Sequence, residues 1–286
     1  MIVVGGGVYG IALTLEASRR GLKTLLLERS DFGSETSWNS LRIVHGGLRY
    51  LQSLDLRRFF ESVSERRWFL RHFPDLEHPL PCLMPLYGQG LKRPSVFRAA
   101  LATNAILSAT RNRGVEPEGY LPAGKVLSSA ETLERFPLAP REGLRGAALW
   151  YDAAMPDSQR LLLEMLHWAC NCGASAINYM KATAYEEDRK GISRVTAIDR
   201  QSGEETTFLA ALVINAAGPW CRDVASTFDR DAPELFHYSV AVNVVLDRPP
   251  LAHAGVAISP RSRAGRTYFL VPWKGRIMAG TYHAPW

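Results

Sequence analysis

The chain has 286 residues, enough for one large domain or two of moderate size. Its hydrophobic content of 47% and charged content of 22% are ordinary for a globular protein, and no apolar run approaches the roughly 18 residues that span a membrane. The net charge of +6 is thinly spread, so it favours anionic ligands slightly, and we expect no nucleic-acid partner.

The four cysteines form neither a CxxC pair nor a zinc-ligand spacing with histidine, so we expect no metal site. The N-terminus leads straight into an apolar segment and lacks the basic stretch of a secretory signal peptide. These two observations favour a cytoplasmic protein with reduced thiols.

The first thirty residues contain a glycine-rich turn between two apolar segments. Gly5, Gly7 and Gly10 match the pattern G-x-G-x-x-G, residues 8–20 have helical spacing, and a second apolar run ends at Glu28. This order of strand, turn, helix, strand and acid is typical of a βαβ dinucleotide-binding unit. Gly5 would permit the tight turn, Gly7 the close approach of the pyrophosphate, and Gly10 the packing of helix on strand. The helix N-terminus would bind phosphate and Glu28 the ribose, but the unit alone does not distinguish FAD from NAD.

A predicted helix over 54–72 carries a group of arginines. A solvated basic face is the simpler interpretation, and contact with a membrane surface is the alternative. Under the alternative, the protein would be peripheral at the inner face of the membrane. The arginines are Arg57, Arg58, Arg66, Arg67 and Arg71.

The rest of the chain alternates between predicted helices and strands. Residues 74–98 are rich in proline and glycine and indicate a connection. A long helix is predicted from Asp157 to Gly173, and a buried strand begins at Leu212. Shorter elements are predicted as helices at 99–112 and 128–135 and as strands at 175–179, 181–187, 193–200, 205–209, 238–247 and 266–281.

This order of elements predicts an α/β fold. A Rossmann-like dinucleotide-binding domain, built from the βαβ unit and a small β-meander, would be interrupted by an inserted, discontinuous α+β substrate domain. We assign residues 1–75 and 150–230 to the first domain. Residues 76–149 and 231–286 are assigned to the second, a cap domain that we expect to be incomplete at its C-terminal end.

Several well-separated motifs give the chain a more specific resemblance. The segment His45–Leu51 reads HGGLRYL, which is more specific than any glycine turn. Together with GGGVYG at 5–10, ERSDF at 28–32, WYD at 150–152 and NAAGPW at 215–220, it resembles the FAD-dependent glycerol-3-phosphate dehydrogenases. These belong to the wider D-amino-acid-oxidase-like (DAO) flavoproteins, so the resemblance favours FAD over NAD.

The resemblance also implies a set of cofactor contacts. The segment from Thr36 to Gly47 would pass the pyrophosphate and the flavin ring, and Gly46 and Gly47 would leave room for the isoalloxazine. Hydroxyl and N–H groups of Thr36, Ser37 and Ser40 would bind phosphate oxygens or the ring. The other implied contacts are Arg29, which follows Glu28; the backbone of Ala182, at the adenine; and Ala217 and Gly218, close to the FAD.

On the substrate side, the resemblance implies roles for three residues. Arg49 and Tyr50 would face the substrate, with the planar Arg49 guanidinium holding the substrate phosphate through two hydrogen bonds. His45 would contact the flavin and is the only nearby candidate for a general base. Each residue also has a structural alternative: a loop-capping histidine, an arginine in a surface ion pair, and a tyrosine in core packing.

The implied activity is oxidation of a small secondary alcohol by hydride transfer to flavin. Glycerol 3-phosphate, oxidised to dihydroxyacetone phosphate in glycerol metabolism, is the first candidate substrate, and the electron acceptor is not indicated. Gly280–His283 reads GTYH where relatives read GTTD, which puts the substrate in more doubt than the FAD. The alternatives are an oxidase of an amino acid or 2-hydroxy acid, and a flavin-binding protein without catalysis. We expect the chain to lack the family's last, C-terminal segments.

Overall fold

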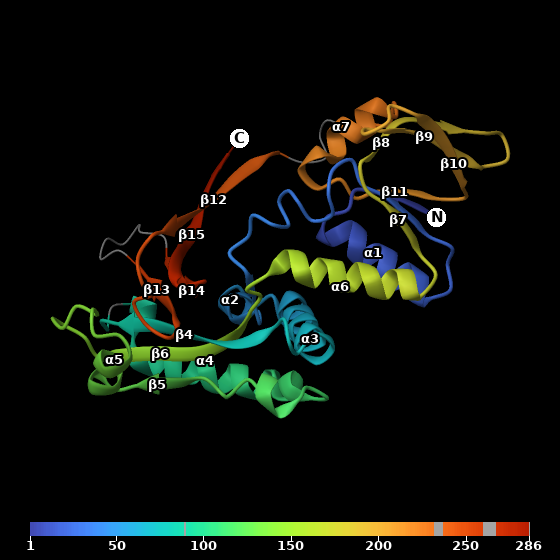
Figure 1. The fold of residues 1–286 in the computed structure, drawn as a ribbon. Helices are drawn as coiled ribbons and strands as arrows, with labels where there is room; N and C mark the ends of the chain where they lie inside the picture. Colours follow the sequence, from blue (N-terminus) through green and yellow to red (C-terminus); the bar gives the residue numbers. More distant parts are fainter. Residues whose placement is uncertain (89, 232–236, 260–266, 286) are drawn as a thin grey trace. The chain divides into compact units, whose positions relative to one another are not determined.

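The computed structural model describes residues 1–88, 90–231, 237–259 and 267–285 (Figure 1). The chain forms two compact units. The first unit consists mainly of Met1–Ser40 and Asp157–Val240, and the second of Leu41–Pro156 and Ala241–Ala284. Residues 41–75 and 150–156, which the sequence assigned to the nucleotide-binding domain, therefore belong to the second unit. The reason is that β3 (Ile43–Val44) and α3 (Leu56–His72) pack against β6 (Gly146–Ala154), a strand of that unit.

A parallel sheet is the centre of the first unit. Its order is β11-β1-β2-β7, and helices α1 and α6 lie side by side in it (Figure 1). This arrangement confirms the predicted βαβ unit and the Rossmann-like fold. The elements are β1 (Ile2–Val4), α1 (Val8–Arg19), β2 (Leu25–Leu27), α6 (Ser158–Asn171), β7 (Ser175–Ile177) and β11 (Val213–Asn215).

Helix α6 illustrates how the sequence determines these elements. The Asp157 carboxylate caps it by accepting the backbone N–H of Arg160 at 3.2 Å. Its buried side chains recur at helical spacing, as the sequence predicted. They are Ser158, Leu161, Leu162, Met165, Leu166 and Ala169.

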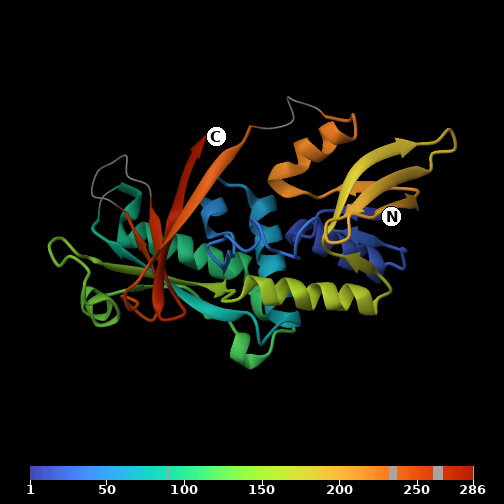
Figure 2. The same cartoon turned by 45° about the horizontal axis from the view of Figure 1, so that its top comes forward.

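The predicted β-meander is also confirmed. Strands β8 (Met180–Glu187), β9 (Ser193–Asp199) and β10 (Glu205–Ala210) form an antiparallel sheet, seen as the extended yellow ribbon in Figure 2. Asp188 fixes the first turn because its carboxylate accepts the N–H groups of Lys190 at 2.8 Å and Ile192 at 2.9 Å. After β11 come a 3₁₀ turn, η4 (Gly218–Trp220), and helix α7 (Cys221–Thr227).

The second unit is built on a larger mixed sheet. Its strand order is β12-β15-β14-β13-β4-β6-β3, and β5 pairs with β6. The strands are β3 (Ile43–Val44), β4 (His78–Leu86), β5 (Lys125–Leu127), β6 (Gly146–Ala154), β12 (Ser239–Leu246), β13 (Gly255–Ile258), β14 (Tyr268–Trp273) and β15 (Arg276–Pro285). The first residue of the strand region predicted at 266–281 lies outside the described residues.

The helices of this unit match the sequence in part. Helix α3 (Leu56–His72) and helix α5 (Ser129–Arg135), which Ser128 caps, confirm their predictions. The helix predicted at 99–112 is instead α4 (Pro94–Leu107), which begins at a proline. Short α2 (Leu48–Gln52) and the 3₁₀ turns η1 (Gly90–Lys92), η2 (Ala109–Asn112) and η3 (Pro117–Gly119) were not predicted. Within the described ranges, no helix is long and apolar enough to cross a membrane.

The prediction of a connection at 74–98 is wrong, because β4 is a long strand in the interior of the sheet. It pairs with β6 along its whole length. Prolines rarely occupy such strands because they lack a backbone N–H. Pro79, Pro81 and Pro85 all stand at odd positions, and backbone N–H groups alternate in direction along a strand. The missing donors therefore all face the same neighbouring strand.

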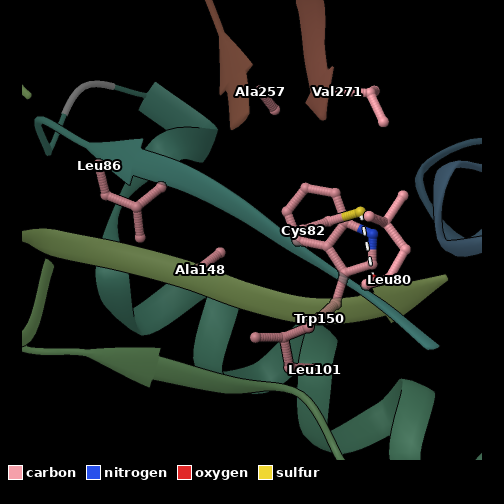
Figure 3. Close-up of a cluster of buried hydrophobic side chains, with 8 residues drawn as sticks. All are labelled: Leu80, Cys82, Leu86, Leu101, Ala148, Trp150, Ala257 and Val271. Carbon is pink, nitrogen blue, oxygen red and sulfur yellow. Dashed lines mark hydrogen bonds between the residues drawn. The ribbon is translucent and has the colours of Figure 1, made fainter. Parts of the chain in front are cut away.

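The side chains between these prolines build a hydrophobic cluster (Figure 3). Cys82 on β4 lies opposite Trp150 on β6, and Leu101 reaches the cluster from α4. The packing of β4, β6 and α4 around Trp150 fixes the C-terminal half of β6, where Asp152 lies. The cluster consists of Leu80, Cys82, Leu86, Leu101, Ala148, Trp150, Ala257 and Val271.

A buried carboxyl group precedes β4. Glu77 is 1% exposed, and neither of its oxygens has a hydrogen-bond partner among the described residues. Burial alone raises its pKa to about 8. Between pH 4.5 and about 8, the folded protein thus holds a proton that the unfolded chain has lost. Stability should fall as pH rises through this window, by roughly 5 kcal/mol in all.

Glu77→Gln should therefore raise the melting temperature at pH 8 and leave it nearly unchanged at pH 5. Glutamine has a similar shape but cannot ionise, so the cost of keeping the group neutral disappears. Melting temperatures at the two pH values, with the exposed Glu65→Gln as control, test this prediction. An equal shift at both pH values would mean that Glu77 is not protonated in the folded protein.

Candidate cofactor site and catalytic cluster

Two of the three glycines in the turn of the first unit are required by packing within the protein. Gly5 has φ +110°, and a Cβ there would lie 2.6 Å from the Ala216 carbonyl oxygen. A Cβ on Gly10 would overlap the carbonyl oxygen of Gly5. Gly7 differs, because its Cβ would meet only the Ser37 hydroxyl, at 3.1 Å. No packing within the described protein therefore strictly requires glycine at position 7, which is the position expected to face a pyrophosphate.

Glu28 lies beside this turn and is 9% exposed. One carboxylate oxygen accepts the backbone N–H of Gly6 at 2.6 Å, and the other accepts that of Ser30 at 2.7 Å. Glu28 thus holds the glycine turn to the end of β2. Each oxygen keeps further acceptor capacity, so the predicted ribose contact stays a prediction.

Ser37 lies at the N-terminus of α1, where its hydroxyl oxygen accepts the N–H of Val8 at 2.9 Å. Ala217 also approaches the turn, since a Cβ on Gly5 would come within 2.8 Å of its Cα. The Arg29 guanidinium lies 4.5 Å from the ring centroid of Trp220, in the turn that begins at Gly218. The structure therefore brings several predicted cofactor residues together around the start of α1. Of the other predicted cofactor residues, Thr36 is exposed and Ser40 is half-buried. Ala182 packs against a hydrophobic cluster that includes residues of β8 and β9.

This arrangement fits the adenosine and pyrophosphate part of a dinucleotide. The first turn of α1 offers backbone N–H groups, which lack intrahelical acceptors at any helix start. Gly7 leaves space in front of them, Ser37 supplies a hydroxyl and Glu28 an anionic acceptor.

A second cluster, in the second unit, centres on Asp152 near the end of β6. Its carboxylate is 6% exposed, accepts three hydrogen bonds and lies within hydrogen-bond distance of the His45 ring. Oδ1 accepts the N–H of Gly46 at 2.7 Å and that of Arg66 at 2.9 Å. Oδ2 lies 3.2 Å from Nδ1 of His45 and 3.3 Å from the indole nitrogen of Trp150. We call these five residues the Asp152 cluster.

The charges of this cluster stabilise one another. Burial alone would raise the pKa of Asp152, but the hydrogen bond and charge of His45, the Arg66 guanidinium and the Gly46 N–H together lower it. Burial lowers the pKa of Arg66, and Asp152 opposes this change. Burial, with the nearby Asp152, raises the pKa of the Cys82 thiol. Asp152 therefore stays an anion in a dry environment.

Of the three predicted substrate-side residues, His45 belongs to this cluster, and Arg49 and Tyr50 follow it in the chain. His45 is half exposed and its ring makes an edge contact with Phe269. Arg49 is exposed on α2, and no described residue forms an ion pair or hydrogen bond with its guanidinium. Tyr50 is half-buried on the same helix. The alternative of a surface ion pair for Arg49 is therefore not seen among the described residues.

Contacts and backbone conformation within the second unit explain why positions 46 and 47 are glycines. A Cβ on Gly46 would overlap the Arg66 guanidinium, and Gly47 has φ +81° with Ser62 at 3.0 Å from its missing Cβ. Their predicted contact with the flavin is not tested by these distances and stays a prediction.

Sequence reasoning missed the role of Asp152 and Arg66. Asp152 was noticed only as part of the WYD motif, and Arg66 only as one of several helical arginines. Arg66 carried one usable signal: it lies among apolar residues on the buried face of α3, with Phe59, Val63 and Leu70. A charge at such a position calls for a buried partner.

The fold and the first site together define a dinucleotide-binding architecture. Comparison with known proteins makes this specific. The family described as "FAD dependent oxidoreductase" (DAO) matches residues 1–286, and the chain belongs to this family.

Three known proteins illustrate the likeness. The chain is 32% identical to a glycerol-3-phosphate dehydrogenase of Synechocystis sp., covering 98% of this chain and 51% of the relative. The solved glycerol-3-phosphate dehydrogenase of Bacillus halodurans, complexed with FAD, is 27% identical with a TM-score of 0.73, covering 100% of this chain and 47% of that one. Glycine oxidase of Geobacillus kaustophilus, 22% identical with a TM-score of 0.59 over 99% of this chain and 71% of that one, shares the fold. The chain spans about half the length of the curated relatives it matches.

Glu28→Gln should weaken FAD binding roughly ten- to a hundred-fold. Hydrogen bonds from ribose would lose a charged acceptor, worth on the order of 1.5–3 kcal/mol. The amide also keeps only one acceptor oxygen, so its NH₂ group would face one of the two backbone N–H groups that Glu28 accepts. Titration of the apoprotein with FAD measures the change, and the exposed Glu16→Gln on α1 is the control. Unchanged FAD affinity would show that Glu28 serves the glycine turn alone.

Proposed function

We propose that the protein containing this chain is an FAD-dependent dehydrogenase that oxidises glycerol 3-phosphate to dihydroxyacetone phosphate. The observation that carries the proposal is the contact between His45 and the buried Asp152. Arg49 follows His45 by four positions in the chain. Such a sequence places a proton acceptor and an exposed cation near one another along the chain. The glycerol-3-phosphate dehydrogenase relatives supply the substrate class.

The cofactor would be held by the first unit. Gly7, Ser37 and the N-terminus of α1 would bind the pyrophosphate, and Glu28 would bind the ribose. FAD, when bound, supplies a two-electron acceptor for the hydride that leaves the carbinol carbon of the substrate. No cysteine or histidine stands out as an attachment point, so we expect heat to release the cofactor as free FAD.

The residues of the second unit would bind and orient the substrate. Arg49 would hold the phosphate with its guanidinium, and Tyr50 would border the same site. His45 would accept the proton of the substrate hydroxyl as the carbonyl forms.

Anaerobic reduction of the flavin in the full-length protein tests the proposal. Glycerol 3-phosphate should bleach the flavin absorbance, and glycerol should do so far more slowly. Bleaching by an amino acid or 2-hydroxy acid instead would favour the alternative oxidase, in which Arg49 holds a carboxylate. No bleaching by any of these compounds would favour a flavin-binding protein without catalysis. The electron acceptor can then be sought by reoxidation of the bleached enzyme.

We also propose that the start of α3 makes a peripheral contact with a membrane surface. The start of α3 exposes Leu54 (81%), Leu56 (47%) and Phe60 (47%) beside Arg57 and Arg58. Apolar and basic side chains together suit a surface of anionic lipid. Each arginine also forms an exposed ion pair within the helix region, as a merely solvated face would.

Sedimentation with vesicles separates these two interpretations. The full-length protein should bind vesicles that contain phosphatidylserine better than vesicles of phosphatidylcholine alone, and Leu54→Ser with Phe60→Ser should reduce binding. Equal binding by the variant, or none by either protein, would leave a solvated basic face.

A further inference from the structure

We propose that Asp152 is a positioning residue that keeps His45 in the tautomer able to accept a proton at Nε2. The proposal deepens the proposed function and rests on it. Asp152 would not touch the substrate. It would act through His45, with Arg66, Gly46 and Trp150 holding its carboxylate in place.

The geometry of the carboxylate fixes the direction of its bond to His45. An ionised carboxylate only accepts hydrogen bonds. Gly46, Arg66 and Trp150 are donors whatever the pH of the solution. The remaining contact, from Oδ2 to Nδ1 of His45 at 3.2 Å, therefore requires the proton on Nδ1. In the neutral ring, the lone pair then lies on Nε2.

Burial differs between the two partners in a way that suits this role. The Asp152 side chain is 6% exposed, whereas the His45 side chain is 54% exposed. The carboxylate is thus shielded and fully occupied, while the far side of the imidazole is accessible. Phe269 lies edge-on to the ring, with 6.2 Å between the two ring centroids.

Arg66 and Gly46 hold the Asp152 carboxylate in its position beside His45. The Arg66 side chain is 5% exposed and also donates to the Tyr151 carbonyl oxygen at 2.7 Å, so it is anchored at two points on β6. Only glycine at position 46 leaves room for its guanidinium. The first glycine of the HGG motif is therefore needed to admit a buried arginine, which in turn balances the charge of Asp152.

The proton and electron balance of the proposed step is simple. The O–H bond of the substrate breaks, and its proton moves to Nε2 of His45. The electron pair of that bond forms the second carbon–oxygen bond, while the C–H pair leaves as hydride to the FAD that the family employs. His45 becomes an imidazolium, and Asp152 stabilises the positive charge across the Nδ1 hydrogen bond.

Asp152→Asn in the full-length protein tests the role. An amide has one acceptor oxygen, which Gly46 and Arg66 occupy at the Oδ1 position. Its NH₂ group would then face His45, so Nδ1 would have to accept and the proton would move to Nε2. We expect kcat with glycerol 3-phosphate to fall roughly 10²- to 10⁴-fold with FAD affinity unchanged. The exposed Asp75→Asn is the matched control.

A readout that is independent of turnover is the tautomer itself. In protein labelled with ¹⁵N-histidine, the imidazole shifts assigned through a His45→Gln variant should report Nδ1–H in the wild type and Nε2–H in Asp152→Asn. Because the wild-type measurement does not depend on the folding of Asp152→Asn, a wild-type Nε2–H tautomer would overturn the proposal outright. An active wild type whose Asp152→Asn variant keeps both tautomer and kcat would overturn it as well. If wild-type flavin is bleached by no polyol while the tautomer is as stated, the proposed function fails and the positioning of His45 by Asp152 stands.

Discussion

Gly46→Ala should destabilise the second unit by about 3–5 kcal/mol, the range found when one partner of a buried ion pair is lost. The new methyl group would overlap the guanidinium of Arg66, which sits in the only direction open to a Cβ. Arg66 would have to leave Asp152, and both charges would lose hydrogen bonds that burial makes costly to replace. Urea denaturation measures the loss.

Gly255→Ala is a control in the same unit. Gly255 is also buried, but the nearest atom to its missing Cβ is the Cys82 sulfur at 3.7 Å, an ordinary contact. A sharper control places Gly46→Ala in an Arg66→Ala background, where the methyl group no longer meets a guanidinium. The two substitutions should be strongly non-additive. Additive losses would mean that Arg66 is not the reason for glycine at position 46.

Gly46 also shows where sequence reasoning reaches its limit. The HGG motif predicted that something approaches the backbone closely, and the missing Cβ does have a close neighbour. The sequence and the resemblance assigned that neighbour to the flavin. The structure adds Arg66, which lies twenty positions away on α3. Which group fills a space is decided by tertiary packing, and a local motif does not contain that information.

The parts of the fold with local signals were predicted well. The βαβ unit, helix α6 with its Asp157 cap and the hairpin turns each depend on residues close together in the chain. Strand β4 was missed because its prolines carry a local signal for a connection, whereas its pairing with β6 involves residues about seventy positions apart. The Asp152 cluster was missed for the same reason, since Asp152 and Arg66 are 86 positions apart.

Arg49→Gln should harm the use of a phosphorylated substrate far more than it harms flavin binding. Arg49 is exposed on α2, and no described residue pairs with its guanidinium, so its removal leaves no internal partner uncompensated. Glutamine keeps some length and hydrogen bonding but loses the charge and the guanidinium fork. If Arg49 holds a dianionic phosphate in a partly dry site, kcat/KM should fall about thirty- to a thousand-fold. This corresponds to a loss of roughly 2–4 kcal/mol in transition-state stabilisation.

Comparison of two substrates gives this prediction its sharpest form. Glycerol 3-phosphate and glycerol should be assayed in wild type, in Arg49→Gln and in Arg98→Gln, an exposed arginine on α4 that serves as control. A rise in KM with kcat preserved would mean that Arg49 binds ground state and transition state equally, and equal falls in kcat and kcat/KM would mean that the contact forms chiefly in the transition state. The loss should be confined to the phosphorylated substrate, because glycerol offers Arg49 no anion. Should Arg49→Gln slow both substrates by the same factor, Arg49 is not the phosphate anchor, and the choice of glycerol 3-phosphate over a carboxylate substrate loses its main support within this chain.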